Sequence, residues 1–133
     1  MATILLIGTD GALLEGVAQL LAGSGHAISM AHTLSEGRAL AALAPPLAVL
    51  VETGIALADP QGIPAPMVRG GAVLLYRTDE RPSTIIPATL QRLVLADLAL
   101  PLERHRLVTL VRCMADRASV TGRRQQHEER RPR

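Results

Sequence analysis

Leu47 to Val51 form an unbroken run of five apolar residues, which the pair Pro45-Pro46 precedes and Glu52 follows. A run of this length without polar alternation is typical of a strand that is covered on both faces, as in the interior of a parallel sheet. In open α/β sheets, ligands bind outside the carboxyl ends of such strands. Glu52 is therefore the first candidate site residue.

Similar short apolar runs recur along the chain and alternate with segments of helical spacing. Four further strands are predicted at 3–7, 27–31, 72–76 and 93–100. Helices are predicted after Asp10, from the capping box Thr33 to Glu36, over 82–93 with Thr84 as the cap, and from Pro101 onward. This alternation predicts an α/β fold with a doubly wound, five-stranded parallel sheet.

The segment 53–71 departs from this alternation because it carries three prolines and four glycines. We therefore expect the third helix to be short or missing. Its apolar residues then either fold back over the sheet or form an exposed patch of the kind that marks an interface. These residues are Ile55, Leu57, Ile63, Met67 and Val68.

The charged residues divide the chain into two parts, which we interpret as a domain at 1–118 and a charged, disordered tail at 119–133. The first part carries 9 Arg and 10 acidic residues, and the second carries 5 Arg and 2 acidic residues. An Arg-rich tail could contact phosphates, but Glu128 and Glu129 oppose this, and Tyr76 is the only aromatic residue available for base stacking. The sequence thus weighs against nucleic acid as a partner.

Several function classes are disfavoured by what the chain lacks. It has no Lys, which excludes Schiff-base chemistry, and no nucleotide-binding or nucleophile motif. The four His and Cys113 show no metal-ligand spacing, so no metal, cofactor or catalytic residue is predicted. A single cysteine, with no signal peptide or long apolar run, predicts a cytoplasmic protein without a membrane span.

Taken together, the order and spacing of these segments resemble the receiver domain of bacterial response regulators over residues 3–118. The resemblance rests on ILLIGTD, PPLAVLVE, LLYRT and LADLALPLERHRLVTLVR, which match the first, third, fourth and fifth strands with their flanks. It implies a flavodoxin-like sheet with strand order 2-1-3-4-5 and a role in signal transduction.

The residues that carry the chemistry of this family mostly do not match. The acidic pair that holds magnesium falls on Gly8 and Thr9, with Asp10 one place late. The phosphoacceptor falls on Glu52, or on Val51 in the neighbouring register.

The switch and cation positions also differ in part. Thr78 matches the switch hydroxyl, Leu100 stands where the family has Lys, and Pro101 is kept. Asp97 replaces the aromatic partner of the switch. Because phosphotransfer needs a divalent cation and a positive charge beside the phosphoryl group, the resemblance implies a pseudo-receiver that is not an enzyme.

Glu52 has two interpretations. Its carboxylate either imitates a phosphorylated aspartate and hydrogen-bonds Thr78, or it is a solvated carboxylate at the end of a strand. The alternative function is a small-ligand-binding module of flavodoxin-like form that uses the pocket around Gly8, Thr9, Asp10, Glu52 and Thr78; conventional phosphotransfer ranks last because Lys is missing.

A protein surface remains as the means of action. The resemblance implies a protein partner or a homodimer that uses the fourth helix, the fifth strand and the last helix. Charged residues on or near this surface could form salt bridges across a two-fold axis, or could form a solvated face. They are Arg92, Asp97, Glu103, Arg104, Arg106 and Arg112.

Overall fold

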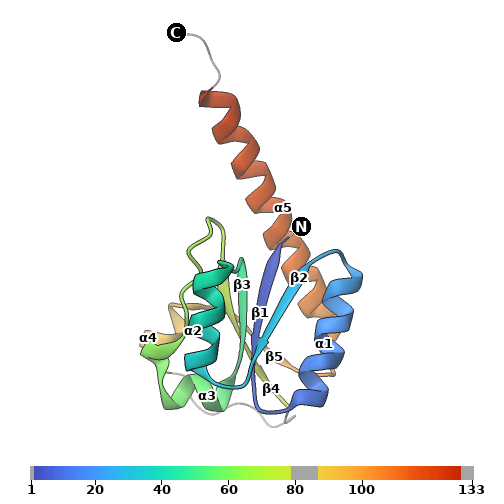
Figure 1. Cartoon of the computed structure of the whole chain (residues 1–133), viewed down its shortest axis with the longest axis vertical. Coiled ribbons are helices and arrows are strands. Elements are labelled where there is room, and N and C mark those ends of the chain that lie inside the picture. Colours follow the sequence, from blue (N-terminus) through green and yellow to red (C-terminus); the bar gives the residue numbers. More distant parts are fainter. Residues whose placement is uncertain (1, 79–86, 130–133) are drawn as a thin grey trace.

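Five parallel strands form one sheet in the order β2-β1-β3-β4-β5 (Figure 1). The computed structural model describes residues 2–78 and 87–129, with side chains described up to Ser119. The strands are β1 (Thr3–Ile7), β2 (Ala27–Ala31), β3 (Ala48–Glu52), β4 (Ala72–Arg77) and β5 (Val94–Ala99). The predicted fold class and strand order are confirmed.

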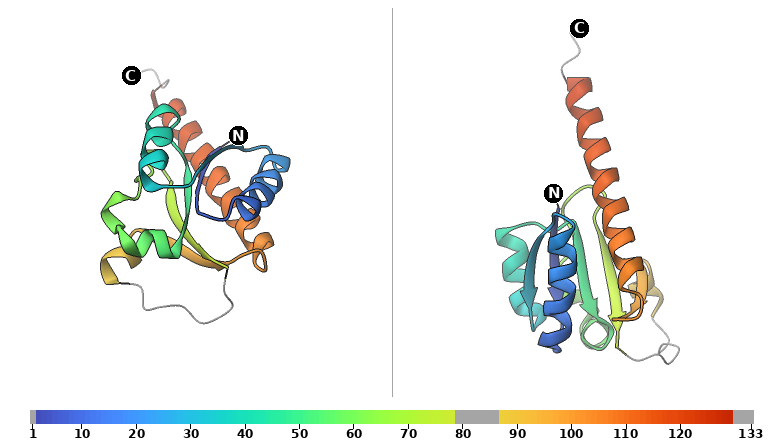
Figure 2. Two further views of the ribbon diagram at one scale, coloured as in Figure 1. Left: turned by 60° about the horizontal axis from the view of Figure 1, so that its bottom comes forward. Right: turned by 90° about the vertical axis from the view of Figure 1, so that its right-hand side faces the viewer.

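Helices cover both faces of the sheet (Figures 1 and 2). On one face lie α1 (Gly11–Gly23) and α5 (Arg104–Glu129); on the other lie α2 (Leu34–Leu43), α3 (Thr53–Ala58) and α4 (Ala88–Gln91). A single 3₁₀ turn, η1 (Pro60–Gly62), follows α3. None of the helices that the structure describes is long and apolar enough to cross a membrane.

Alternate residues of each central strand enter two separate apolar layers. Leu6, Leu50 and Leu74 pack with Leu107 and neighbouring residues under α1 and α5. The residues between them pack under α2, α3 and α4, as their alternation along a strand requires. The run Ala48 to Val51 is fully buried, so its prediction as an interior strand is confirmed.

The predicted helix caps of α1 and α2 are present. Asp10 Oδ1 accepts a hydrogen bond from the Leu13 N–H at 3.1 Å. Thr33 Oγ1 accepts one from the Glu36 N–H at 3.1 Å, and Glu36 Oε2 accepts one from the His32 N–H at 3.0 Å. These side chains satisfy backbone donors that have no partner within their own helix.

The segment after β3 confirms the short third helix, since α3 has six residues. Ile63 is buried, and Ile55 and Leu57 pack against the core, so this part folds back over the sheet. Met67 remains 85% exposed and Val68 is also exposed. The fold-back prediction is thus confirmed for the first part of the segment, and an interface at Met67 and Val68 stays a prediction.

Two helix predictions near the end of the chain are wrong. The last helix begins at Arg104 and not at Pro101, because residues 100–103 form a turn in which Glu103 Oε1 accepts a hydrogen bond from the Ala99 N–H at 2.8 Å. The same helix continues to Glu129, beyond the predicted end at Ala118. Residues 123–129 are mostly Arg, Gln and Glu, which have high helix propensity, and their charge alone does not prevent a helix. The boundary between 1–118 and 119–133 stays a prediction.

The fourth helix is shorter than predicted. Its described part spans four residues, Ala88–Gln91, and begins after Pro87. The predicted cap Thr84 lies outside the described residues. Strand β5 begins one residue later and ends one residue earlier than predicted, at Val94 and Ala99.

Candidate functional site

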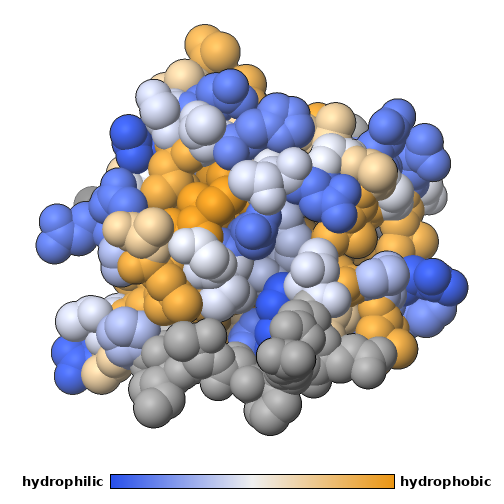
Figure 3. Space-filling view, turned by 90° about the horizontal axis from the view of Figure 1, so that it is seen from below, coloured by the Kyte–Doolittle hydropathy of each residue, from blue (hydrophilic) through white to orange (hydrophobic). Residues whose placement is uncertain are grey.

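Residues predicted from the resemblance meet where β1, β3 and β4 end; we call Gly8, Thr9, Asp10, Glu52 and Thr78 the carboxyl edge. The parallel register aligns Ile7 with Val51 and Glu52 with Tyr76, which brings these strand ends together. Figure 3 shows this side of the molecule, with hydrophilic residues in the middle between two hydrophobic areas. The predicted site residues of these three strands are thus neighbours.

Glu52 is bound by Thr9. Its Oε2 accepts hydrogen bonds from the Thr9 N–H at 3.0 Å and from the Thr9 hydroxyl at 2.9 Å. Among the described residues, none of its hydrogen bonds goes to Thr78, which is exposed. The hypothesised Glu52–Thr78 bond is therefore not present in this structure, and whether Glu52 imitates a phosphorylated state stays a prediction.

Asp10 serves the helix that follows it. One carboxylate oxygen caps α1 through the Leu13 N–H, as the sequence predicts. Within the part of the chain that the structure describes, three or more His, Cys, Asp or Glu side chains nowhere come together as metal ligands. The acidic residues of the edge are thus used in hydrogen bonds within the protein.

Tyr76 is a residue of the edge that the sequence pattern did not reveal. A Cβ built on Gly8 would overlap the Tyr76 hydroxyl oxygen, and it would lie 3.0 Å from the Tyr76 Cζ and 3.5 Å from Glu52 Oε2. The phenol therefore fills the space into which any side chain at position 8 would extend. A signal existed, because the only aromatic residue of the chain lies two places before Thr78.

Magnesium, which the receiver fold implies, does not fit this arrangement. The ion takes oxygen ligands in a nearly octahedral set and is usually bound through one or two carboxylates. Here the first acidic position is Gly8, and the Tyr76 phenol takes the place of its side chain. Asp10 is a helix cap and Glu52 is held by Thr9.

The Tyr76 hydroxyl lies in an environment that keeps it neutral. Tyr76 is 1% exposed, and its burial raises the pKa of the phenol well above its ordinary value. The nearby carboxylates of Glu52 and Asp10 raise this pKa further. The hydroxyl oxygen has no hydrogen-bond partner among the described residues. A neutral, unpaired phenol beside two carboxylates is a hydrogen-bond donor and not a base.

His32 is a second residue of the edge that the sequence pattern did not reveal. It follows β2, and its Nδ1 lies 3.1 Å from the Gly8 carbonyl oxygen. A histidine N–H at this position can donate to that carbonyl and so fix the turn after β1. Sequence spacing offered no signal for this contact, because residues 8 and 32 belong to different strand ends.

Leu100, which stands where the receiver pattern has Lys, carries no charge. Leu100 is 2% exposed and belongs to the apolar layer under α1 and α5. Its N–H donates to the Arg77 carbonyl oxygen at 2.8 Å. The Arg77 guanidinium is paired with Asp97, whose Oδ2 accepts from Arg77 Nη1 at 2.8 Å. An ion pair between β4 and β5 thus stands where the resemblance expects the aromatic partner of the switch.

The six charged residues predicted for a partner surface divide into two groups. Asp97 is paired with Arg77, and Glu103 with Arg106 at 3.1 Å, all within the chain. The Ala99 N–H and Arg106 lower the pKa of the Glu103 carboxyl. The other three residues, Arg92, Arg104 and Arg112, have exposed side chains.

Comparison with known proteins identifies the fold through solved structures and not through sequence. No family model and no curated protein matches the sequence. Solved structures do match: the N-terminal domain of a response regulator/sensory box/GGDEF three-domain protein from Carboxydothermus hydrogenoformans superposes with a TM-score of 0.66 at 14% identity, covering 90% of this chain and 98% of that one.

Two further structures agree. A CheY-like receiver domain protein from Methanospirillum hungatei JF-1 has a TM-score of 0.66 at 16% identity, with 91% of this chain and 98% of that chain covered. The pseudo-receiver domain of the CikA protein has a TM-score of 0.63 at 18% identity, with 86% and 98% covered. In fold, this chain is a receiver-like domain.

Proposed function

We propose that the chain acts as an atypical receiver-like module in signal transduction, which works without phosphorylation by binding a protein partner or a second copy of itself. The observation that carries this proposal is the Tyr76 phenol in the space of a side chain at position 8. A receiver that accepts a phosphoryl group needs acidic side chains there to hold a divalent cation.

Two other features support the same proposal. Leu100 presents hydrocarbon where a cation would hold the phosphoryl oxygens, and Arg77 is neutralised by Asp97. Transfer of a phosphoryl group depends mainly on positioning and on charge stabilisation, and of the described residues neither Leu100 nor the paired Arg77 supplies a free positive charge. We therefore assign no catalytic residue and infer that the protein is not an enzyme.

The partner surface that we propose comprises the exposed parts of α4, β5 and α5. Leu93 and Leu95 are each 54% exposed, Leu95 on the edge strand β5 and Leu93 directly before it, and Arg92 is exposed beside Leu93 in the chain. Arg112 is exposed on α5. An edge strand with exposed apolar side chains is a surface that proteins usually cover or use. A cytoplasmic location is part of the proposal and is supported by the single, exposed Cys113.

Phosphorylation is tested by incubating the chain with acetyl phosphate and Mg²⁺ and measuring its intact mass. We expect no gain of a phosphoryl group, while a conventional receiver domain treated in the same tube gains one. A phosphoryl group on Glu52 or Asp10 of this chain would contradict the proposal.

The surface is tested by light scattering and by pull-down with two matched variants. Leu95→Arg changes an exposed apolar residue of the edge strand β5, and Met30→Arg changes one of the opposite edge strand β2, where Met30 is 46% exposed. We expect Leu95→Arg alone to reduce assembly or partner capture. Equal effects of both variants, or no effect of Leu95→Arg, would reject the surface.

The alternative, a small-ligand site at the carboxyl edge, loses the space that Tyr76 fills at Gly8. A cavity lies nearby, between α1 and Pro101.

A further inference from the structure

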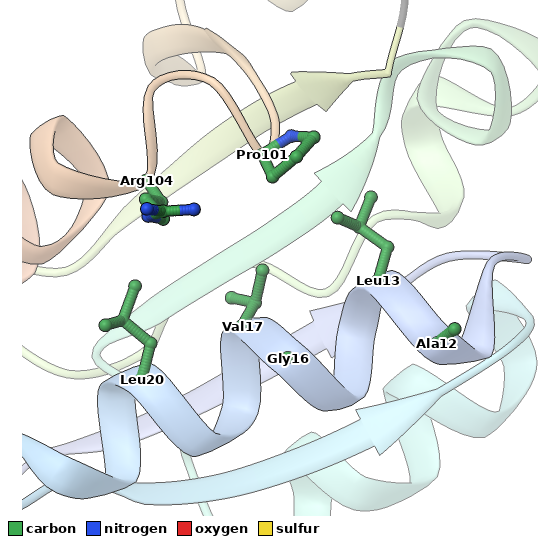
Figure 4. A pocket seen from close by; sticks show the side chains of 7 residues that line it. All are labelled: Ala12, Leu13, Gly16, Val17, Leu20, Pro101 and Arg104. Carbon is green, nitrogen blue, oxygen red and sulfur yellow. The ribbon is translucent and has the colours of Figure 1, made fainter.

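A cavity of about 320 Å³ opens between α1 and the turn that joins β5 to α5 (Figure 4). Figure 4 shows Leu13, Val17 and Leu20 of α1 on one side and Pro101 and Arg104 on the other. Ala12 and Gly16 complete the lining. None of the carboxyl-edge residues lines this cavity, so the site does not depend on the proposed function.

The lining combines hydrocarbon with one cation. Leu13, Val17, Leu20 and Pro101 offer apolar surface, and Arg104 is the only charged residue among the seven. In the described part of the chain, the ion pairs formed by Arg side chains are those of Arg77 and Arg106, so Arg104 is left without an acidic partner. A guanidinium with no carboxylate beside it favours an anion, and its planar fork fits a carboxylate through two parallel hydrogen bonds.

Gly16 is an independent sign that this wall of the cavity is kept open. Glycine is disfavoured inside a helix relative to alanine. A Cβ at Gly16 would meet nothing within 4 Å, so packing within the fold does not require glycine there. The missing side chain instead leaves room along this wall of the cavity, on the stretch of α1 between Leu13 and Leu20 (Figure 4).

We propose that this cavity binds a small carboxylate with an apolar body, such as an aromatic or short aliphatic acid. The carboxylate binds Arg104, and the body lies on Leu13, Val17 and Leu20 across from Pro101. The volume is at the lower end for small-molecule sites, which are mostly apolar with a few polar groups that fix orientation. A protein partner would need a far larger contact, about 800 Å² on each side.

The test is a titration of the full chain with benzoate, in which binding is monitored through the backbone amide chemical shifts in NMR. Benzamide is the uncharged control. We expect saturable benzoate binding with a Kd of roughly 1 mM or below, with the shifts centred on α1 and residues 101–104. Benzamide should bind at least about tenfold more weakly, because it cannot form charge-assisted hydrogen bonds.

Two variants and their matched controls locate the site. Arg104→Gln should weaken benzoate binding about tenfold or more, whereas Arg112→Gln, also exposed on α5, should leave it unchanged. Gly16→Ala should weaken binding while raising the melting temperature, because the added methyl group enters the cavity and alanine favours the helix. Gly23→Ala, at the end of α1 and also in open space, should leave binding unchanged.

Three results would overturn the proposal. These are no saturable benzoate binding, equal binding of benzamide, and unchanged binding after Arg104→Gln. If an acidic amphipathic peptide shifted the same residues while benzoate did not, the groove would belong to a protein partner, and the small-carboxylate proposal would also fail.

Discussion

Replacing Gly8 by alanine is expected to destabilise the protein, although the backbone of residue 8 allows an L side chain. Gly25 and Gly70 are the only glycines with positive φ among the described residues, so the backbone conformation at position 8 does not require glycine. It is needed for space, because a Cβ would overlap the Tyr76 hydroxyl oxygen. The prediction is that this cost depends on the Tyr76 hydroxyl.

The magnitude follows from two opposing effects. Overpacking in a buried site costs about 1–3 kcal/mol, and the reduced entropy of the unfolded chain after Gly→Ala returns about 0.4–1 kcal/mol. Gly8→Ala should therefore lower the free energy of unfolding by about 0–2.6 kcal/mol in the wild-type background, with a central value of ~1.3 kcal/mol. In the Tyr76→Phe background the overlapping oxygen is gone, and only the 3.0 Å approach to Cζ remains. The same change should then cost close to zero, which is a coupling of about 1 kcal/mol.

The assay is a double-mutant cycle in which urea unfolding is monitored by circular dichroism. Fluorescence is unsuitable, because the chain has no Trp and its only aromatic residue, Tyr76, is mutated in the cycle. Gly16→Ala, where a Cβ meets open space, is the control and should raise stability in both backgrounds by about 0.5–1 kcal/mol. Equal costs of Gly8→Ala in the two backgrounds would refute the assignment of Tyr76 to the space at position 8. So would a gain in stability in the wild-type background.

Three further predictions concern ionisable groups. Burial and the carboxylates of Glu52 and Asp10 raise the pKa of Tyr76, so an ultraviolet absorbance titration should show no phenolate near about pH 10 until the protein unfolds; an ordinary titration curve would contradict this. Burial lowers the pKa of His26 below its unfolded value of about 6.5, so the stability that neutral His26 provides is complete above that value and is lost as the pH falls through the folded pKa. In His26→Gln, the unfolding free energy should depend less steeply on pH below about 6.5. An unchanged slope in this pH range would contradict the lowered pKa of His26. Alanine variants of Arg77 and Asp97 should show a coupling of roughly 1 kcal/mol that weakens at high salt, since both side chains are partly exposed, and a coupling near zero would show that the pair is not stabilising.

The sheet could be predicted from the sequence because its physical signals are local. Continuous apolar runs at 3–7 and 47–51 require burial on both faces, and only a parallel sheet with helices on both sides provides it. The caps at Asp10 and Thr33 were also predictable, since each depends on residues three places away. The ends of α4 and α5 were not predicted correctly. The turn at 100–103 depends on the Glu103 carboxylate, and the polar end of α5 has no proline up to Glu129.

The carboxyl edge was predicted only in part, since its contacts join different strands. Alignment with the receiver pattern identified Glu52 and Thr78 as neighbours in the fold, but it did not show that Thr9 binds Glu52. Nor did it show that Tyr76 fills the space at Gly8, which requires the register of β1, β3 and β4 and the direction of one side chain. Side-chain direction between strands is a tertiary property, and a pattern along the chain does not contain it.

The proposed loss of phosphotransfer does not rest on any single residue, because the replacements support one another. An acidic side chain returned to position 8 would meet the Tyr76 hydroxyl before it could bind a cation. A lysine returned to position 100 would replace a side chain that is 2% exposed within an apolar layer, and burying an unpaired ammonium there is costly. The apolar core is thus packed around the changed site, so recovery of phosphotransfer would require residues 8, 76 and 100 to change together: 8 and 76 for the metal ion, and 100 for the phosphoryl oxygens. A surface that acts by binding is not affected by this packing, which is why the proposed function is assigned to a surface and not to the carboxyl edge.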